Sequence, residues 1–338
     1  MTLRNKRFLS SLTAALLLSL SASSLSCGGA DDTFGLIGGE KIDASLVDRD
    51  PLALLPSGII LLGYADLATM FQSKWGADAN QIVESLLPLG AESNFSAQRD
   101  VSRLFGGVYA MQGADFCAVV QGNFDADAIR RAADARSITI SGAPLVKTRY
   151  AENDLYTAGN IGFVVVTAHT VITGNETGIR RALDRLRRGK LERAVPQWMV
   201  DLMNTKNASM IVAGDLASQS VVDAASAKLP FLGKLNAVRI LGNFQPPGMN
   251  FAGALTYPDA QAAQVGAQSL QQVQQLASLV SIFSSFGFGA PLPSPQIAQQ
   301  QSDVAFTVQV EDSLVKVLLQ QAGAITKSAV TSSKVPPG

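Results

Sequence analysis

The stretch FCAVVQGNFDADAIRRAADA, from Phe116 to Ala135, contains the signals for a strand, a turn and a helix in one continuous segment. Its first residues are aromatic, β-branched or small, which favours a buried strand. Asn123 and Asp125 supply side-chain oxygens for a turn and a helix N-cap, and Asp127 adds a second acid in the first helical turn. We therefore expect a helix to begin after Asp125, and we interpret the two acids as helix-stabilising rather than catalytic.

A similar unit follows about 130 residues later, in NFAGALTYPDAQAAQVGAQSL, residues 250–270. A second match sets GIILLGYADLATMF, residues 58–71, beside ASMIVAGDLASQSVVDAA, residues 208–225, with an Asp-Leu-Ala step in both. The predicted order in each half is strand, helix, two strands, helix, one or two strands, helix. The sequence therefore predicts an α+β fold of two similar halves, each a mostly antiparallel sheet with helices packed on one face.

The predicted organisation of the chain follows from these patterns. It comprises a signal peptide at 1–26, a lipidated cysteine and flexible linker at 27–50, the first half at 51–193, the second half at 194–326 with an apolar insertion at 270–295, and a loose tail at 327–338.

Composition excludes some classes of protein. With 338 residues and 47% hydrophobic content, the chain is long and apolar enough to build sizeable cores. Lys and Arg together number 27, as do Asp and Glu, and the predicted leader removes Arg4, Lys6 and Arg7 from that balance. The mature chain is thus slightly acidic, which argues against a nucleic-acid partner.

The N-terminus has the three parts of an export signal: a basic start, an apolar run from Phe8 to Leu20, and small residues up to Cys27. The segment Ser24-Leu25-Ser26-Cys27 resembles a bacterial lipobox, although Leu25 stands where a small residue is usual. The resemblance implies that Cys27 is acylated and becomes the new N-terminus, and Gly28 after it implies the outer membrane. The alternative is an ordinary signal-peptidase site near the same place. Under the first interpretation, the membrane is a partner through the N-terminal lipid.

Several short features of the body recur in one known group of proteins. They are a proline before the first apolar strand, Pro56; an Asp-capped helix, Asp66; and a strand followed by Gly122, Phe124 and Asp125, with Tyr257 to Asp259 in the second half. The pattern, over about residues 50–325, resembles a family of exported bacterial proteins of unknown function. The resemblance implies a fold and a location outside the cytoplasm, and it implies no activity.

The sequence contains few residues that form metal or catalytic sites. His169 is the single histidine and Cys117 is the second of two cysteines, and no paired-cysteine or paired-histidine spacing occurs. We expect no metal and no cofactor, a solvated turn residue at His169 and an inert buried thiol at Cys117. A Cys/His pair is the alternative, because such partners meet in space rather than in sequence.

Two surfaces are candidates for binding. The helix predicted from Glu176 carries several arginines, of which Arg181, Arg185 and Arg188 are candidates for contact with an anionic surface, or simply a solvated face. In the apolar insertion, Phe283, Phe286 and Phe288 stand among serine, glycine and proline. They are candidates for ligand or membrane contact, and the alternative is that this segment folds back and completes a core.

These observations predict a non-catalytic cell-envelope lipoprotein that acts as a binding or structural module, with the phenylalanine-rich insertion and the concave sheet surface as its contact surface for a protein partner or ligand. The alternative in another class is a carrier or chaperone for an apolar ligand such as lipid, with the phenylalanines of the insertion at the pocket. An enzyme without a known motif is third. A lined apolar cavity of about 300–1,000 Å³ would favour the carrier.

Overall fold

The structure is a computed structural model. It describes residues 33–34, 42–110, 115–139, 142–189, 191–217, 219, 226, 230–244, 248–277, 295–312, 315–316, 319–320 and 323. The fold below is that of the compact unit that begins at Phe34.

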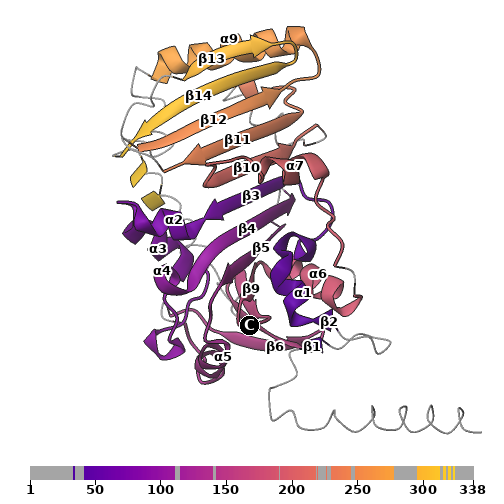
Figure 1. The fold of residues 1–338 in the computed structure, drawn as a ribbon, viewed down its shortest axis with the longest axis vertical. Coiled ribbons are helices and arrows are strands. Elements are labelled where there is room, and N and C mark those ends of the chain that lie inside the picture. The colour runs from indigo at the N-terminus through magenta and orange to yellow at the C-terminus, as the bar shows by residue number, and fades with distance from the viewer. Residues whose placement is uncertain are drawn as a thin grey trace, which may run out of the picture. The chain divides into compact units, whose positions relative to one another are not determined.

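One twelve-stranded antiparallel sheet organises this unit, in the order β13-β14-β12-β11-β10-β3-β4-β5-β9-β8-β7-β6 (Figure 1). Its strands are β3 (Leu61–Asp66), β4 (Val101–Ala110), β5 (Asp115–Gly122), β6 (Val146–Tyr150), β7 (Asn153–Ala158), β8 (Ile161–Val165), β9 (Thr170–Gly174), β10 (Met210–Asp215), β11 (Ala237–Asn243), β12 (Gly248–Thr256), β13 (Gln296–Gln300) and β14 (Asp303–Glu311). Two short strands, β1 (Thr33–Phe34) and β2 (Ile42–Asp43), precede them. The expected α+β class and antiparallel pairing are confirmed.

The two halves meet in the middle of this sheet, where β3 pairs with β10. Gly63 lies opposite Val212, and from that pair the strand order repeats outward: β3-β4-β5-β9-β8 in one direction and β10-β11-β12-β14-β13 in the other. The repeat has the symmetry of a two-fold axis through the β3–β10 pair. The expected duplication is therefore present as one shared sheet, and β6 and β7 are an addition to the first half.

The described helices are α1 (Ala44–Arg49), α2 (Leu67–Gln72), α3 (Gly76–Glu84), α4 (Ala97–Asp100), α5 (Ala126–Asp134), α6 (Glu176–Arg187), α7 (Gln197–Leu202) and α9 (Ala260–Ala277), with 3₁₀ turns η1 (Pro51–Leu54), η2 (Ala91–Ser93) and η3 (Pro230–Leu232). They lie on both faces of the sheet, whereas the sequence predicted one face. The reason is that strands of the first half are buried on both sides, as in β8 and β9, where every residue is buried.

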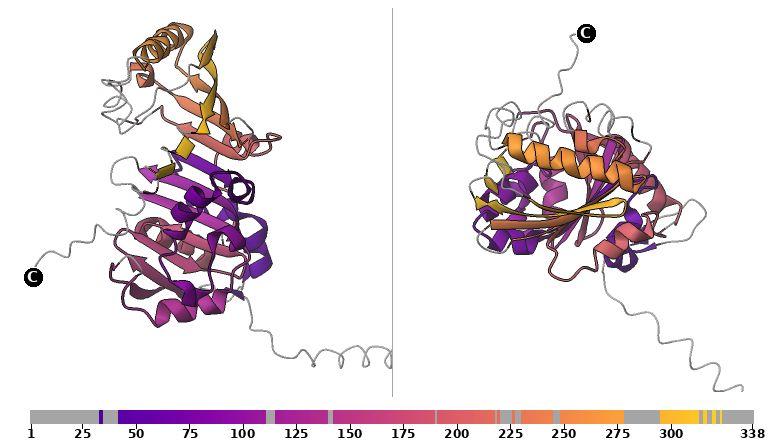
Figure 2. Two further views of the ribbon diagram at one scale, coloured as in Figure 1. Left: turned by 90° about the vertical axis from the view of Figure 1, so that its left-hand side faces the viewer. Right: turned by 90° about the horizontal axis from the view of Figure 1, so that it is seen from above.

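One face, which we call the α5/α9 face, carries Val120, Phe163 and Leu255. In the first half it packs against α2, α3 and α5, with Ile129 of α5 fully buried in that core. In the second half it packs against α9 through Ala263 and Ala267, and α9 lies along this side of β12 and β14 in Figure 2. Helices α5 and α9 follow equivalent strands, so their common face is what the repeat requires.

The opposite face, which we call the α6 face, carries Leu62, Phe105 and Val119 in the first half. These side chains are buried beneath α1, η1, α6 and α7 in a second core. Leu183 and Leu186 of α6 are almost fully buried there and belong to the apolar stripe of that helix. Both faces of the first half are therefore closed by helices.

Helix caps lie where the sequence placed them. The Asp125 carboxylate accepts a hydrogen bond from the Ala128 backbone N–H at 2.9 Å, and that bond is the main cause of the lowered pKa of Asp125. Asp66 caps α2 through the Thr69 N–H at 3.1 Å. Both residues begin the helices expected of them, and the assignment of Asp125 to capping is confirmed.

Helix α1 occupies residues that the sequence indicated as linker. Val47 is fully buried, and Asp48 Oδ1 accepts hydrogen bonds from the Thr167 and Thr170 hydroxyls, each at 2.6 Å. The Asp48 backbone carbonyl accepts a third from Gln121 Nε2 at 2.6 Å. These long-range contacts order a segment whose own sequence shows no sustained period.

Candidate functional site

The α6 face of the second half is built from three aligned rows of side chains. Because residues alternate between faces along a strand, the register of β11, β12 and β14 places every second residue there. The rows are Asn243, Asn250 and Gln309; Leu241, Ala252 and Thr307; and Arg239, Ala254 and Ala305. This surface is mostly polar or small, whereas the same face of the first half is apolar.

This difference matches the arrangement of helices. In the first half, α6 follows β9 and covers the α6 face. In the second half, the residues described after β14 pack elsewhere, because Val315 belongs to the core of the α5/α9 face. Helix α7 reaches β10, and across β11, β12 and β14 no described helix covers the α6 face. Ala252, Thr307 and Gln309 are exposed there.

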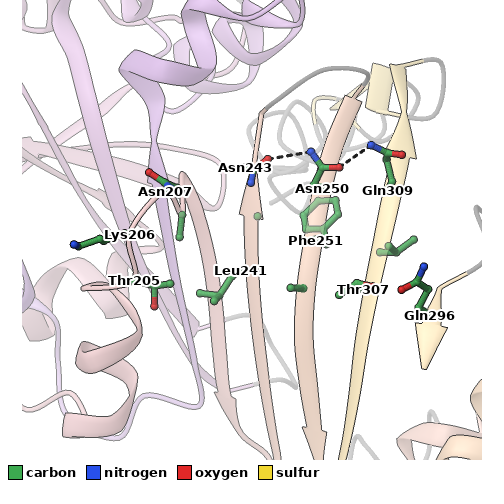
Figure 3. A pocket seen from close by; sticks show the side chains of 14 residues that line it. Thr205, Lys206, Asn207, Leu241, Asn243, Asn250, Phe251, Gln296, Thr307 and Gln309 are labelled. Atoms are coloured by element: carbon green, nitrogen blue, oxygen red, sulfur yellow. Dashed lines mark hydrogen bonds between the residues drawn. The ribbon is translucent and has the colours of Figure 1, made fainter. Parts of the chain in front are cut away.

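A groove of about 620 Å³ lies on this uncovered surface (Figure 3). Its floor is the sheet, one side is the loop from Thr205 to Ala208 before β10, and Gln296 of β13 stands at the other. The described lining residues are Thr205, Lys206, Asn207, Ala208, Leu241, Gly242, Asn243, Asn250, Phe251, Ala252, Gln296, Thr307, Val308 and Gln309. Its volume is within the range of small-molecule sites.

A chain of amide hydrogen bonds crosses three strands at this groove. Gln309 Nε2 donates to Asn250 Oδ1 at 2.9 Å, and Asn250 Nδ2 donates to Asn243 Oδ1 at 3.1 Å. Figure 3 shows the three side chains in line across β11, β12 and β14. Each amide holds its neighbour in one orientation, so the row presents donors and acceptors in a fixed pattern.

The groove carries little charge. Among its described lining residues, Lys206 has the one ionisable side chain. A charged pair on the same face is Arg239 with Asp303 at 3.0 Å, and Arg239 also donates to the Thr256 hydroxyl at 2.9 Å. Those residues do not line the groove. The arrangement therefore suits a ligand that forms neutral hydrogen bonds.

The sequence analysis did not single out these residues, although a signal was present. From Asn250 to Thr256, β12 reads NFAGALT, with small or polar residues at alternate positions, and β14 reads DVAFTVQVE in the same way. That alternation indicates a sheet with one face that no apolar layer covers. Which strands stand side by side, and hence which amides meet, depends on the topology.

Arg181 and Arg185, predicted as contacts for an anionic surface, bind other parts of the first half. Arg181 pairs with Asp115 at 3.0 Å and donates to the Ser57 carbonyl at 2.6 Å. Its guanidinium also lies 4.6 Å from the ring centre of Tyr109. Arg185 donates to the backbone carbonyls of Ala53 and Glu192.

Arg188, the third arginine of that prediction, is exposed. Its contact with an anionic surface stays a prediction. The other predicted site residues, Cys27 and the three phenylalanines Phe283, Phe286 and Phe288, lie outside the described residues, as does most of the apolar insertion.

Cys117 and His169 lie in different environments. Cys117 is fully buried in β5, and burial raises the pKa of its thiol to about 12, so it is the inert residue that was expected. His169 is exposed in the turn before β9, with Nδ1 3.1 Å from the Gly122 carbonyl oxygen. Within the part of the chain that the structure describes, no three or more potential metal ligands come together.

Comparison with known proteins adds a likeness of fold. No family model matches the chain, and no curated protein matches it. Among solved structures, crystal form III of the Treponema protein TP0453 is similar, with a TM-score of 0.52, 12% identity and coverage of 80% of this chain and 98% of that one. Crystal form I of the same protein has a TM-score of 0.50 and 11% identity, and the match covers 80% of this chain and 97% of that one. At this identity the likeness establishes the fold alone.

None of the described helices has the length and apolar character needed to span a bilayer.

Proposed function

We propose that the chain is a non-catalytic binding module of the cell envelope, exported through its leader, attached by lipid at Cys27, and binding a polar ligand in the groove on the α6 face of the second half. The observation that carries the proposal is the contrast between the halves. The α6 face of the first half is apolar and closed by helices, and its counterpart holds an ordered row of amides that no described helix covers.

The chemistry of the groove favours a carbohydrate. Asn and Gln side chains both donate and accept, as sugar hydroxyls do, and the threonines Thr205 and Thr307 add two further hydroxyls. An anionic ligand would require arginines or a cluster of lysines, and the described lining offers Lys206 alone. An apolar ligand would displace water from the exposed polar atoms of these amides without replacing its hydrogen bonds, which costs free energy. We therefore favour an uncharged oligosaccharide over the apolar ligand of the carrier hypothesis.

Binding rather than catalysis fits the same lining. Amides and threonine hydroxyls have no titration near neutral pH and act as hydrogen-bonding groups. General acid–base catalysis uses positioned groups whose pKa lies near the working pH. The row of amides is suited to recognition, because its members are already hydrogen-bonded to one another and lose little freedom when a ligand binds.

Isothermal titration of the purified protein with chitotetraose, an uncharged oligosaccharide, tests this function. We expect saturable binding that falls at least about tenfold in Asn250→Ala and in Gln309→Ala, since each substitution removes about 1.4 kcal/mol or more of hydrogen bonding. Gln264→Ala is the matched control, because Gln264 is an exposed amide on α9, across the sheet from the groove. Equal affinity in all four proteins, or no binding to the unsubstituted protein, would contradict the carbohydrate assignment.

The lipid anchor has its own test. If Cys27 carries the acyl chains, Cys27→Ser will move the protein from the membrane to the soluble fraction, and mass spectrometry of the unsubstituted protein will show the added lipid mass. Cys117→Ser is the control, because that thiol is buried inside the fold. Membrane association that persists in Cys27→Ser, with no acyl mass on the unsubstituted protein, would refute the anchor.

A further inference from the structure

The twelve-stranded sheet ends in two edge strands of different chemistry. At one edge, β6 (VKTRY) carries Lys147 and Arg149, and Lys147 pairs with Asp134 at 2.7 Å and with Asp154 at 2.9 Å. At the other edge, β13 (QIAQQ) has no charged residue. Charged side chains on an edge strand prevent another strand from adding to it. The β6 edge is protected in this way and the β13 edge is not.

The repeat shows that the outer side of β13 is a position for a further strand. By the two-fold relation of the halves, β13 corresponds to β8. The outer side of β8 is occupied by β7, with Tyr156 opposite Phe163 and Ala158 opposite Ile161. In the described part of the sheet, β13 pairs with β14 on its inner side and with no strand on its outer side. The first half therefore fills from its own chain a position that the described part of the second half leaves open.

We propose that a second copy of this chain fills that position, with β13 of each copy pairing antiparallel about a two-fold axis at Ala298. In this register Gln296 lies opposite Gln300 of the other copy, where their amides can exchange hydrogen bonds, and Ala298 lies opposite its own counterpart. Gln296, Ala298 and Gln300 are exposed in the single chain. Pairing therefore brings no like charges together and disrupts no existing core.

The same symmetry limits the assembly to two copies. A dimer formed through β13 has β6 at both of its outer edges. Pairing β6 with itself about Thr148 would place Lys147 opposite Arg149 of another copy, and like charges opposite each other destabilise a strand pair. The contact is isologous and closed, so it does not propagate into a fibre. Because Gln296 also lines the groove, the dimer would join two grooves across one continuous sheet.

Sedimentation velocity of the mature protein, in a detergent matched to the density of the solvent, tests the proposal. We expect a dimer that dissociates on dilution, because a five-residue strand pair is a small interface. Ala298→Lys should give a monomer at every concentration, since it places two lysines together at the axis. Ile138→Lys, which adds the same charge at an exposed site in the first half, should leave the dimer intact. A monomeric unsubstituted protein, or a dimer that persists in Ala298→Lys, would overturn the proposal.

A cysteine cross-link distinguishes this interface from any other. In a Cys27→Ser background, Ala298→Cys should form a disulfide-linked dimer under mild oxidation, because residues opposite each other in an antiparallel pair have Cβ atoms about 4.5–5.5 Å apart. Thr148→Cys, at the centre of β6, should remain monomeric. Cys117 does not compete, since it is fully buried. Cross-linking through Thr148→Cys and not through Ala298→Cys would place the interface at the wrong edge and refute the proposal.

Discussion

Replacing Gly122 with alanine is expected to destabilise the protein by about 3 kcal/mol or more, at the upper end of the cost of overpacking. A Cβ at this position would lie well inside 3.0 Å of the Asp100 carbonyl oxygen, and the Phe124 ring stands close by at 3.1 Å. The obstacle is backbone, which cannot rotate away as a side chain can. Asp100 is also held in place, because its carbonyl accepts the Asn123 N–H at 2.8 Å.

Thermal or urea unfolding measures this effect, with Gly63→Ala as the matched control. Gly63 is also a strand glycine, and a Cβ there would have only the Gly106 carbonyl oxygen within reach, at 4.0 Å. We expect the melting temperature to fall by roughly 5 °C or more in Gly122→Ala and to change little in Gly63→Ala. Equal melting of the two variants would show that the turn after β5 adjusts without cost.

Replacing Asp48 with alanine is expected to cost about 3 kcal/mol. The Asp48 carboxylate accepts the hydroxyls of Thr167 and Thr170, both buried side chains, at 2.6 Å each. Hydrogen bonds to charged groups contribute ~1.5–3 kcal/mol each, and the partial exposure of Asp48 places the pair near the lower end of that range. Without the carboxylate, two buried hydroxyls lose their acceptor and α1 loses its attachment to the turn before β9.

Denaturant unfolding and hydrogen exchange measure this second effect together. We expect a lower unfolding midpoint in Asp48→Ala, with protection lost first in α1, and partial recovery in Asp48→Asn, whose amide oxygen can accept both hydroxyls but carries no charge. Asp43→Ala is the control, because Asp43 caps the same helix through the Ser45 N–H from an exposed position. If Asp43→Ala is as destabilising as Asp48→Ala, the helix end rather than the buried hydroxyls determines the stability.

These two residues illustrate what the sequence can predict. Gly122 lies in the strand, turn and helix unit that the sequence predicts. Every signal in that unit is local: alternation, a capping acid and helix formers. Asp48 stood in a segment without a period, between glycines and acids. Its partners lie 119 and 122 residues away in the sequence, and no local sequence pattern predicts them.

The same distinction explains the rest of the fold. The duplication was predicted from two short matches, and the shared sheet that joins the halves was not, because pairing of β3 with β10 depends on residues far apart in the chain. Edge strands β6 and β13 were missed, because both are short and largely polar and so lack the apolar run that marks a strand. Helices on both faces agree with β8 and β9, which are buried at every residue, and the apolar run of β8 does not by itself indicate whether one or both sides are covered.

For the candidate site, the sequence did not indicate the amide row. The phenylalanine-rich insertion and the concave sheet surface were predicted as the contact region, and both stay predictions. The amide row depends on the pairing of β11, β12 and β14, because Asn243 and Gln309 are neighbours of Asn250 only across strands.

The pairing of β3 with β10, which joins the two halves, has a consequence for the order of folding. The hairpins β4–β5 and β11–β12 join strands that are close in the chain, so they can form early. Pairing of β3 with β10 closes a loop of ~145 residues, whose entropic cost must be met before the contact is gained. Until that step is complete, each half presents an apolar strand with an unpaired edge, and such an intermediate is prone to aggregate. A refolding chain is therefore most prone to aggregate before the two halves pair through β3 and β10.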